Sequence, residues 1–169
     1  AAARLAGGRP DLRLLLGLAP SLDGRAVEAA VAASGIRPTI IHGRTHELIR
    51  AADLVLAVSG TVTLEAAILG TPMVITYRVG TLSWLLARPL VRVRFIGLPN
   101  LVANERIVPE MIQFEATPER LAATAAAILE SPERQARMRE ALAEVRSRLG
   151  APGAAERAAR EVLALLPAS

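Results

Sequence analysis

The clearest chemical signal in the sequence is a turn of small residues that leads into a helix. The segment reads Ser59-Gly60-Thr61-Val62-Thr63-Leu64-Glu65. Free backbone N–H groups and the positive end of the helix dipole meet at a helix N-terminus, where they favour a phosphate group. Ser59, Thr61 and Thr63 add hydroxyl donors, and Gly60 lets the backbone approach an anion closely. The segment therefore predicts a phosphate-binding turn.

Glu65 extends this hypothesis from a phosphate to a sugar nucleotide. Thr61 and Glu65 are four residues apart, so they share one face of the expected helix. A carboxylate on that face can accept hydrogen bonds from sugar hydroxyls while the phosphate lies at the helix tip. A structural alternative stays open, in which Ser59 or Thr61 caps the helix and Glu65 interacts only with the helix dipole.

The composition limits the other chemistry that the chain can perform. Its 169 residues are 52% hydrophobic, 21% charged and 2% aromatic, as expected for one globular domain. Because the sequence has no cysteine and its two histidines are His42 and His46, we expect no metal and no cofactor. All the basic residues are arginine, but the aromatic residues are too few for a typical nucleic-acid surface. We therefore expect no nucleic-acid partner.

Short apolar runs alternate with helical segments along the first half of the chain. Apolar strands separated by helices predict an α/β fold with a doubly wound parallel sheet. Thr45 is the expected cap of its helix, and Gly70 the left-handed end of the helix after the Ser59 turn. Strands are expected at 12–18, 38–42, 54–58 and 73–77, and helices at 1–5 (broken by two glycines), 22–34, 45–52 and 59–69.

Ligands of an open parallel sheet bind beyond the carboxyl ends of its strands, which here selects the loops 19–24, 43–47, 59–65 and 77–81. Between residues 79 and 113 the pattern is less regular. We expect a helical piece around Trp84, a strand at 91–96 and loops near the ligand, including Leu98-Pro99-Asn100.

The remainder, residues 117–169, predicts three helices packed on the same single domain. Two begin with a hydroxyl cap followed by Pro and Glu, and the third begins near Pro152. On the middle helix, Met138, Leu142, Val145 and Leu149 form one apolar stripe. No composition shift marks a domain boundary within residues 1–169.

Residues 52–113 carry a distinctive set of motifs, which are Ser-Gly-Thr-Val-Thr-Leu-Glu-Ala, Thr71-Pro72-Met73-Val74, Tyr77-Arg78, Leu98-Pro99-Asn100-Leu101 and Val108-Pro109-Glu110 through Gln113. Together these motifs resemble the carboxy-terminal half of the lipid-A-disaccharide synthases. By itself, Ser-Gly-Thr followed by Glu would indicate only the wider class of GT-B-type glycosyltransferases and related epimerases. The further motifs narrow the resemblance from that class to this family. The flanking segments are similar in arrangement, so the resemblance covers nearly the whole chain.

The resemblance implies a Rossmann-like donor-binding domain of an inverting, metal-independent glycosyltransferase. The reaction implied is transfer of 2,3-diacylglucosamine from UDP to the 6-hydroxyl of 2,3-diacylglucosamine 1-phosphate, in lipid A biosynthesis. The implied location is cytoplasmic, at the inner face of the inner membrane. Two alternatives stay open: another UDP-N-acetylglucosamine-dependent transferase or epimerase, and a nucleotide-binding module without catalysis.

By the same resemblance, the residues of the Ser59 turn meet the diphosphate and Glu65 meets the ribose. Asn100 is expected to face the same cleft. Arg78 is a further candidate for the diphosphate, because a guanidinium group matches phosphate geometry. A surface salt bridge is the alternative role of Arg78.

Secondary candidates come from three places. Tyr77 lies beside the ligand or in the core. The loop that contains Gly43 and Arg44 corresponds to the place where related enzymes bind the nucleobase. The histidines of this loop would serve either as a general base in catalysis or only as polar contacts. Asn104 and Glu105 follow the Leu-Pro-Asn motif.

Complete members of this family are about twice as long and carry the acceptor site and catalytic base on a first domain. We therefore expect no catalytic residue in this chain. A strand and a Gly-Ser-Arg turn that open the second domain are also missing, which predicts an exposed sheet edge and either low stability or association, a homodimer included. The segment 82–96 combines Trp84 with leucines and arginines, which is typical of contact with an anionic membrane surface or of ordinary packing.

Overall fold

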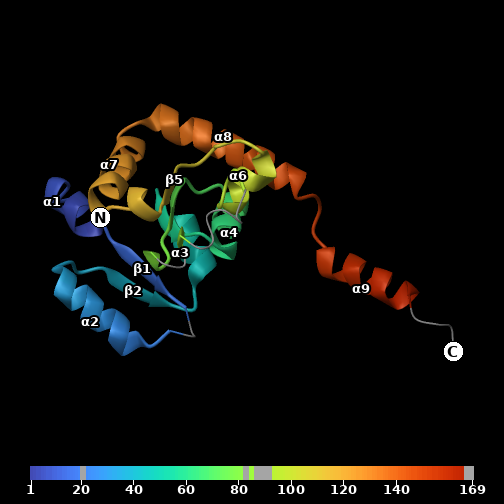
Figure 1. Cartoon of the computed structure of the whole chain (residues 1–169), viewed down its shortest axis with the longest axis horizontal. Coiled ribbons are helices and arrows are strands. Elements are labelled where there is room, and N and C mark those ends of the chain that lie inside the picture. Colours follow the sequence, from blue (N-terminus) through green and yellow to red (C-terminus); the bar gives the residue numbers. More distant parts are fainter. Residues whose placement is uncertain (20–21, 82–83, 86–92, 166–169) are drawn as a thin grey trace.

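The computed structural model describes residues 1–19, 22–81, 84–85 and 93–165. Short strands alternate with helices along the chain (Figure 1), and every strand pairing among these residues is parallel. This confirms the predicted α/β class with helices flanking parallel strands. The strands are β1 (Leu15–Leu18), β2 (Thr39–His42), β3 (Val55–Val58), β4 (Met73–Tyr77) and β5 (Glu110–Ile112).

The helices follow the predicted order, with some changes in their bounds. Thr45 is the first residue of its helix rather than the cap, because Arg44 occupies the N-cap position and makes no side-chain capping bond. The first helix runs through both glycines that were expected to break it. The helices are α1 (Ala2–Gly8), α2 (Gly24–Ser34), α3 (Thr45–Ala51), α4 (Thr61–Leu69), α6 (Leu98–Ala103), the 3₁₀ turn η1 (Gln113–Glu115), α7 (Pro118–Leu129), α8 (Pro132–Arg148) and α9 (Ala154–Ala164).

The strands form two sheets instead of the one continuous sheet that the sequence predicts. One sheet pairs β1 with β2, and the other has the order β3-β4-β5. Within the described ranges, β1 and β3 each pair along a single edge. Leu15 on β1 and Val58 on β3 are 42% and 61% exposed, although strands of a parallel sheet are ordinarily covered. The expected open edge is therefore present in this chain.

The main core fills the space between the three-stranded sheet and the helices α4, α6 and α8. These helices pack against one another, and α4 also packs against β3 and β4. A smaller cluster joins α1 to α7 through Leu5, Ala122 and Ala125, and this contact holds the N-terminal helix in place. The buried residues of the main core are Ile49, Ala66, Ala67, Met73, Val74, Ile75, Val108, Ile128, Met138, Leu142 and Val145.

The two long C-terminal helices begin as predicted. The hydroxyl oxygens of Thr117 and Ser131 each accept a hydrogen bond from the backbone N–H three residues later, at 3.2 Å. The apolar stripe of α8 is buried at Met138, Leu142 and Val145. Leu149 lies beyond the helix and is exposed.

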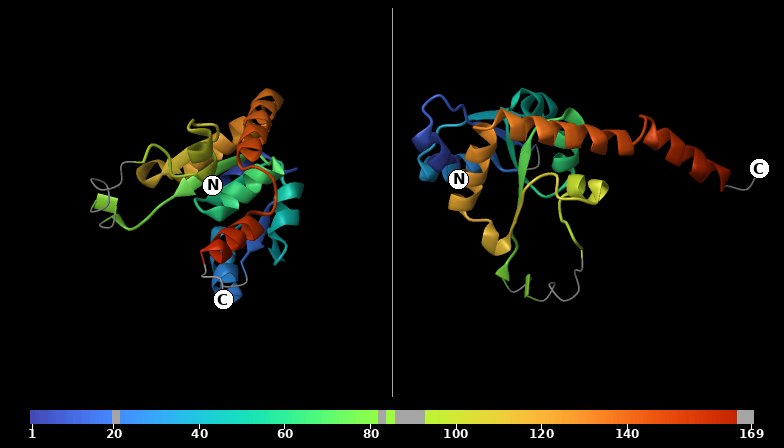
Figure 2. Two further views of the ribbon diagram at one scale, coloured as in Figure 1. Left: turned by 90° about the vertical axis from the view of Figure 1, so that its right-hand side faces the viewer. Right: turned by 90° about the horizontal axis from the view of Figure 1, so that it is seen from above.

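The last helix contradicts the expectation that all of residues 117–169 pack on the domain. Helix α9 extends away from the body of the chain (Figures 1 and 2), and none of its residues is buried. In the part of the chain that the structure describes, no helix is both long enough and apolar enough to cross a membrane.

Residues 98–112 are more regular than the sequence pattern predicts. Leu98-Pro99-Asn100 begins a helix, α6, and Glu110–Ile112 adds β5 beside β4. The strand expected at 91–96 is wrong for residues 93–96, which are irregular, and residues 91–92 lie outside the described ranges. Trp84 is helical, as expected, but most of the proposed membrane segment also lies outside those ranges.

Candidate functional site

The turn that joins β3 to α4 leaves backbone donors available. Gly60 occupies the N-cap position, and no side chain caps the helix, which excludes the structural alternative of a Ser59 or Thr61 cap. Within the described residues, the backbone N–H groups of Gly60, Thr61 and Val62 have no hydrogen-bond acceptor. This turn therefore presents the groups that an anion needs at a helix N-terminus.

Two of the hydroxyl groups expected to add donors are engaged inside the protein. Ser59 Oγ donates to the backbone oxygen of Ile96 at 3.0 Å. Thr63 is fully buried, and its Oγ1 donates to the backbone oxygen of Gly60 at 2.7 Å. Both side chains thus hold the turn in shape, which corrects the expectation that their hydroxyls face a diphosphate. Thr61 is exposed at the first position of α4.

The buried carboxylate of Glu110, on β5, is linked to this turn through hydrogen bonds. Its Oε2 accepts from the backbone N–H of Ile96 at 3.0 Å, and its Oε1 accepts from that of Gly97 at 2.9 Å. Because Ile96 in turn accepts the Ser59 hydroxyl, one chain of hydrogen bonds joins β5 to the turn. The absence of a side chain at Gly97 leaves room for this contact, since an added Cβ would lie 2.9 Å from Glu110 Oε1 and against the Ile75 side chain. The sequence motif contained Glu110, but its role was not predicted.

Asn100 is part of the same buried network and does not face the cleft. Its amide nitrogen donates to the Val108 backbone oxygen at 2.9 Å and to Glu110 Oε1 at 2.7 Å. Its amide oxygen accepts from the backbone N–H groups of Ile107 and Val108, both at 2.9 Å. Every hydrogen-bonding position of the side chain is therefore filled. The prediction that Asn100 contacts the donor is wrong for this structure.

Gln113 holds the loop that carries Arg78. Its side-chain amide makes a pair of hydrogen bonds to the backbone of Val79, at 3.1 Å and 2.9 Å. Arg78 is exposed directly after β4 and makes no ion pair with any described residue, so the surface salt bridge is absent. Tyr77 ends β4 and is half-buried. The guanidinium group of Arg78 is thus available at the ligand side of the sheet.

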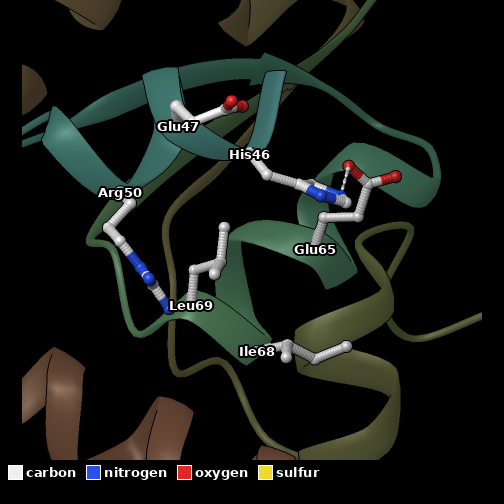
Figure 3. Close-up of a pocket in the computed structure, with 6 residues that line it drawn as sticks. All are labelled: His46, Glu47, Arg50, Glu65, Ile68 and Leu69. Carbon is white, nitrogen blue, oxygen red and sulfur yellow. Dashed lines mark ion pairs between the residues drawn. The ribbon is translucent and has the colours of Figure 1, made fainter. Parts of the chain in front are cut away.

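Glu65 lies beside a hollow between α3 and α4, which we call the α3–α4 hollow. The side chains of His46 and Glu65 point toward each other across it (Figure 3), and His46 Nε2 lies 3.2 Å from Glu65 Oε2. The Glu65 side chain is 36% exposed, so its carboxylate remains open to solvent. The hollow measures about 360 Å³ and is lined by His46, Glu47, Arg50, Glu65, Ile68 and Leu69.

The loop before α3 is open, as a base-binding loop would need. Gly43 adopts a positive φ of 65°, and both Gly43 and Arg44 are exposed. Arg44 Nε lies 3.4 Å from Glu47 Oε1. The pKa of Glu47 is lowered, first by its own backbone N–H at the start of α3 and then by the Arg44 hydrogen bond.

The remaining secondary candidates lie elsewhere. Asn104 ends α6 in the left-handed conformation at a φ of 55°, which is a structural role. Glu105 follows it and lines a different hollow, beside β5. Neither residue joins the Ser59 turn. Among the residues that the structure describes, no three His, Asp or Glu side chains gather in a way that could hold a metal ion.

Comparison with known proteins gives one consistent result. The family model described as lipid-A-disaccharide synthetase matches residues 1–165. The chain is 40% identical over 167 residues to the lipid-A-disaccharide synthase of Myxococcus xanthus, covering 99% of this chain and 44% of that relative. It is 44% identical to the Syntrophus aciditrophicus synthase and 41% identical to that of Geobacter sulfurreducens, covering 94% and 93% of this chain but 42% and 41% of those relatives. The chain thus spans less than half the length of these relatives.

Proposed function

The chain belongs to the lipid-A-disaccharide synthetase family, and we propose that it binds the UDP part of the sugar donor for such a synthase. The observation that carries this proposal is the Ser59-Gly60-Thr61 turn, where backbone N–H groups are free at the start of α4. Glu65 lies one helical turn further along α4 with an accessible carboxylate. Phosphate at the helix tip and ribose at Glu65 fit this arrangement.

Within the complete protein, we propose that this part holds the leaving group of the transfer. The 6-hydroxyl oxygen of 2,3-diacylglucosamine 1-phosphate attacks the anomeric carbon of the donor, and the bond from that carbon to UDP breaks. Arg78 and the helix N-terminus offset the negative charge that develops on UDP. The base that takes the hydroxyl proton belongs outside residues 1–169. No metal takes part in this scheme.

The acylated substrates place the proposed reaction at a membrane surface. We propose a peripheral position on the cytoplasmic face of the inner membrane. The match to synthases of lipid A supports this location, because both substrates carry acyl chains under the proposed reaction.

Calorimetric titration with UDP and with uridine tests the donor site residue by residue. Glu65→Ala is expected to weaken both ligands, because both contain the ribose. Arg78→Gln is expected to weaken UDP by about tenfold or more and to leave uridine unchanged, since the lost bond is to phosphate. Glu140→Ala, an exposed glutamate on α8, is the matched control and should change neither.

The pattern across the two ligands decides the assignment. Equal losses of UDP and uridine affinity in Arg78→Gln would refute the diphosphate role of that arginine. Unchanged affinities in Glu65→Ala would refute the ribose role. Failure of the folded wild-type chain to bind UDP would contradict the proposal that residues 1–169 contain a sufficient donor site.

A further inference from the structure

A second hollow follows the free edge of β5, and we call it the β5 groove. It has a volume of about 590 Å³ and lies between residues 105–111, α7 and α8. The strand order β3-β4-β5 puts β4 between this edge and β3, the strand that leads to the Ser59 turn. None of the residues that line the α3–α4 hollow lines this groove. The β5 groove is therefore separate from the proposed donor site.

Four arginines from three parts of the chain line the β5 groove. Arg106 comes from the loop before β5, Arg120 from α7, and Arg134 and Arg137 from α8. Arg120 pairs with Glu115 at 3.3 Å. Across the described ranges, the other three arginines make no ion pair with a carboxylate. Three arginines thus line one hollow without an ion pair to any described carboxylate.

Three carboxylates line the groove beside the four arginines. Glu110 also lines it, but its two oxygens accept hydrogen bonds from Ile96, Gly97 and Asn100 on the inner side. The carboxylate of Glu133, on α8, accepts from the Ser131 hydroxyl at 2.8 Å. Glu115, which pairs with Arg120, and the exposed Glu105 are the other two acids of the lining. The lining itself therefore carries four arginines and three glutamates, an excess of one positive charge, and Glu133 is not part of it.

The inner part of the groove is apolar. Val108, Ile128 and Met138 line it and are buried in the main core. The other apolar residues of the lining are Ile107, Pro109, Met111 and Ala141. A ligand that fills the groove would therefore meet arginine side chains at its rim and hydrocarbon at its floor.

We propose that the β5 groove binds a phosphate-bearing ligand, with its phosphoryl group between Arg134 and Arg137 and an apolar portion against Ile128 and Met138. Arg134 and Arg137 are three residues apart, so they are neighbours on one face of α8. Guanidinium groups match phosphate oxygens in geometry as well as in charge. A volume of about 590 Å³ is typical of small-molecule sites. This proposal does not depend on the donor site.

Calorimetry on the whole 169-residue chain, with saturating UDP present, tests the proposal. Glycerol 1-phosphate supplies the phosphate alone, and dihexanoyl phosphatidic acid, used as a monomer, adds the apolar chains. Dihexanoyl phosphatidylcholine is the probe without net charge. Arg134→Gln/Arg137→Gln removes two groove arginines, while Arg139→Gln/Arg146→Gln removes the same charge from the same helix outside the groove. Far-UV circular dichroism checks that both double variants keep their helices.

The groove variant is expected to lose about tenfold or more in affinity for the phosphate probes, and the control variant less than about twofold. Tighter binding of phosphatidic acid than of glycerol 1-phosphate identifies a lipid source, and equal binding identifies a free phosphate compound; both support the site. Equal losses in the two variants would show a general basic surface and overturn the proposal. Equal binding of phosphatidylcholine, or no binding of either phosphate probe at millimolar concentration, would also overturn it.

Discussion

Replacing Glu110 by glutamine is expected to destabilise the fold strongly, although the two side chains have almost the same shape. The Glu110 carboxylate accepts three hydrogen bonds, from the backbone of Ile96 and Gly97 and from the Asn100 amide, and only 3% of the residue is exposed. In glutamine, an NH₂ group replaces one of the two oxygens, so a donor must face a donor. The change loses at least one charge-assisted bond, worth about 1.5–3 kcal/mol, and leaves a buried N–H unpaired at about 1–3 kcal/mol.

The expected loss in the free energy of unfolding is therefore about 2.5–6 kcal/mol for Glu110→Gln. Urea unfolding monitored by circular dichroism measures it as a shift of the midpoint at an unchanged slope. Glu105→Gln makes the same chemical change at an exposed position in the same region and should stay within about 0.5 kcal/mol of the wild type. A Glu110→Gln variant as stable as Glu105→Gln would refute the role given to this carboxylate.

Two further predictions concern the C-terminal helices. Leu142→Ala is expected to lower the free energy of unfolding by about 2–5 kcal/mol because Leu142 is fully buried. Leu149→Ala, at a position that is 38% exposed, should lower it by less than about 1 kcal/mol. Urea unfolding of the two variants measures both losses. Backbone N–H groups at the starts of α7 and α8 lower the pKa of Glu119 and Glu133 below the ordinary value of 4.5. The stability that these two carboxylates contribute should therefore be lost as the pH falls below 4.5. In unfolding measured as a function of pH, the double variant Glu119→Gln/Glu133→Gln should show a smaller decline.

The sequence was most informative where local chemistry decides the structure. β4 has its predicted bounds, and the hydroxyl-Pro-Glu segments begin α7 and α8 as expected. Gly70 ends α4 in the left-handed conformation, at a φ of 73°. In these places a cap, a proline or a short apolar run determines the conformation without help from distant residues.

The sequence was misleading where distant contacts decide the structure. The irregular pattern predicts a loop that includes Leu98-Pro99-Asn100, yet Pro99 fits the first turn of α6. β5 is three residues long and begins with Glu110, which gives no apolar pattern to detect. Its place beside β4 depends on the buried network with Asn100, and no single segment reveals that network.

The motifs that carry the family resemblance divide into two physical roles. Gly60, Thr61 and Glu65 are accessible and could touch a ligand, whereas Asn100 and Gln113 are buried and bond to the protein itself. Residue types alone cannot separate these roles, because an amide that binds a sugar and an amide that binds the backbone look the same in a sequence. The two roles can be told apart only when the hydrogen-bond partners of each side chain in the folded structure are known.

The open edges of β1 and β3 follow from the same reasoning about backbone groups. Each strand has one partner among the described residues, so its other row of N–H and C=O groups lacks a strand to pair with. Leu56 and Val58 on β3 are 40% and 61% exposed, and such apolar, unpaired edges favour association. Water can satisfy the backbone groups of an open edge, but it cannot cover these side chains. Pairing with another strand would satisfy the backbone groups and bring neighbouring side chains beside Leu56 and Val58. This is the physical basis for expecting either low stability or association of this chain.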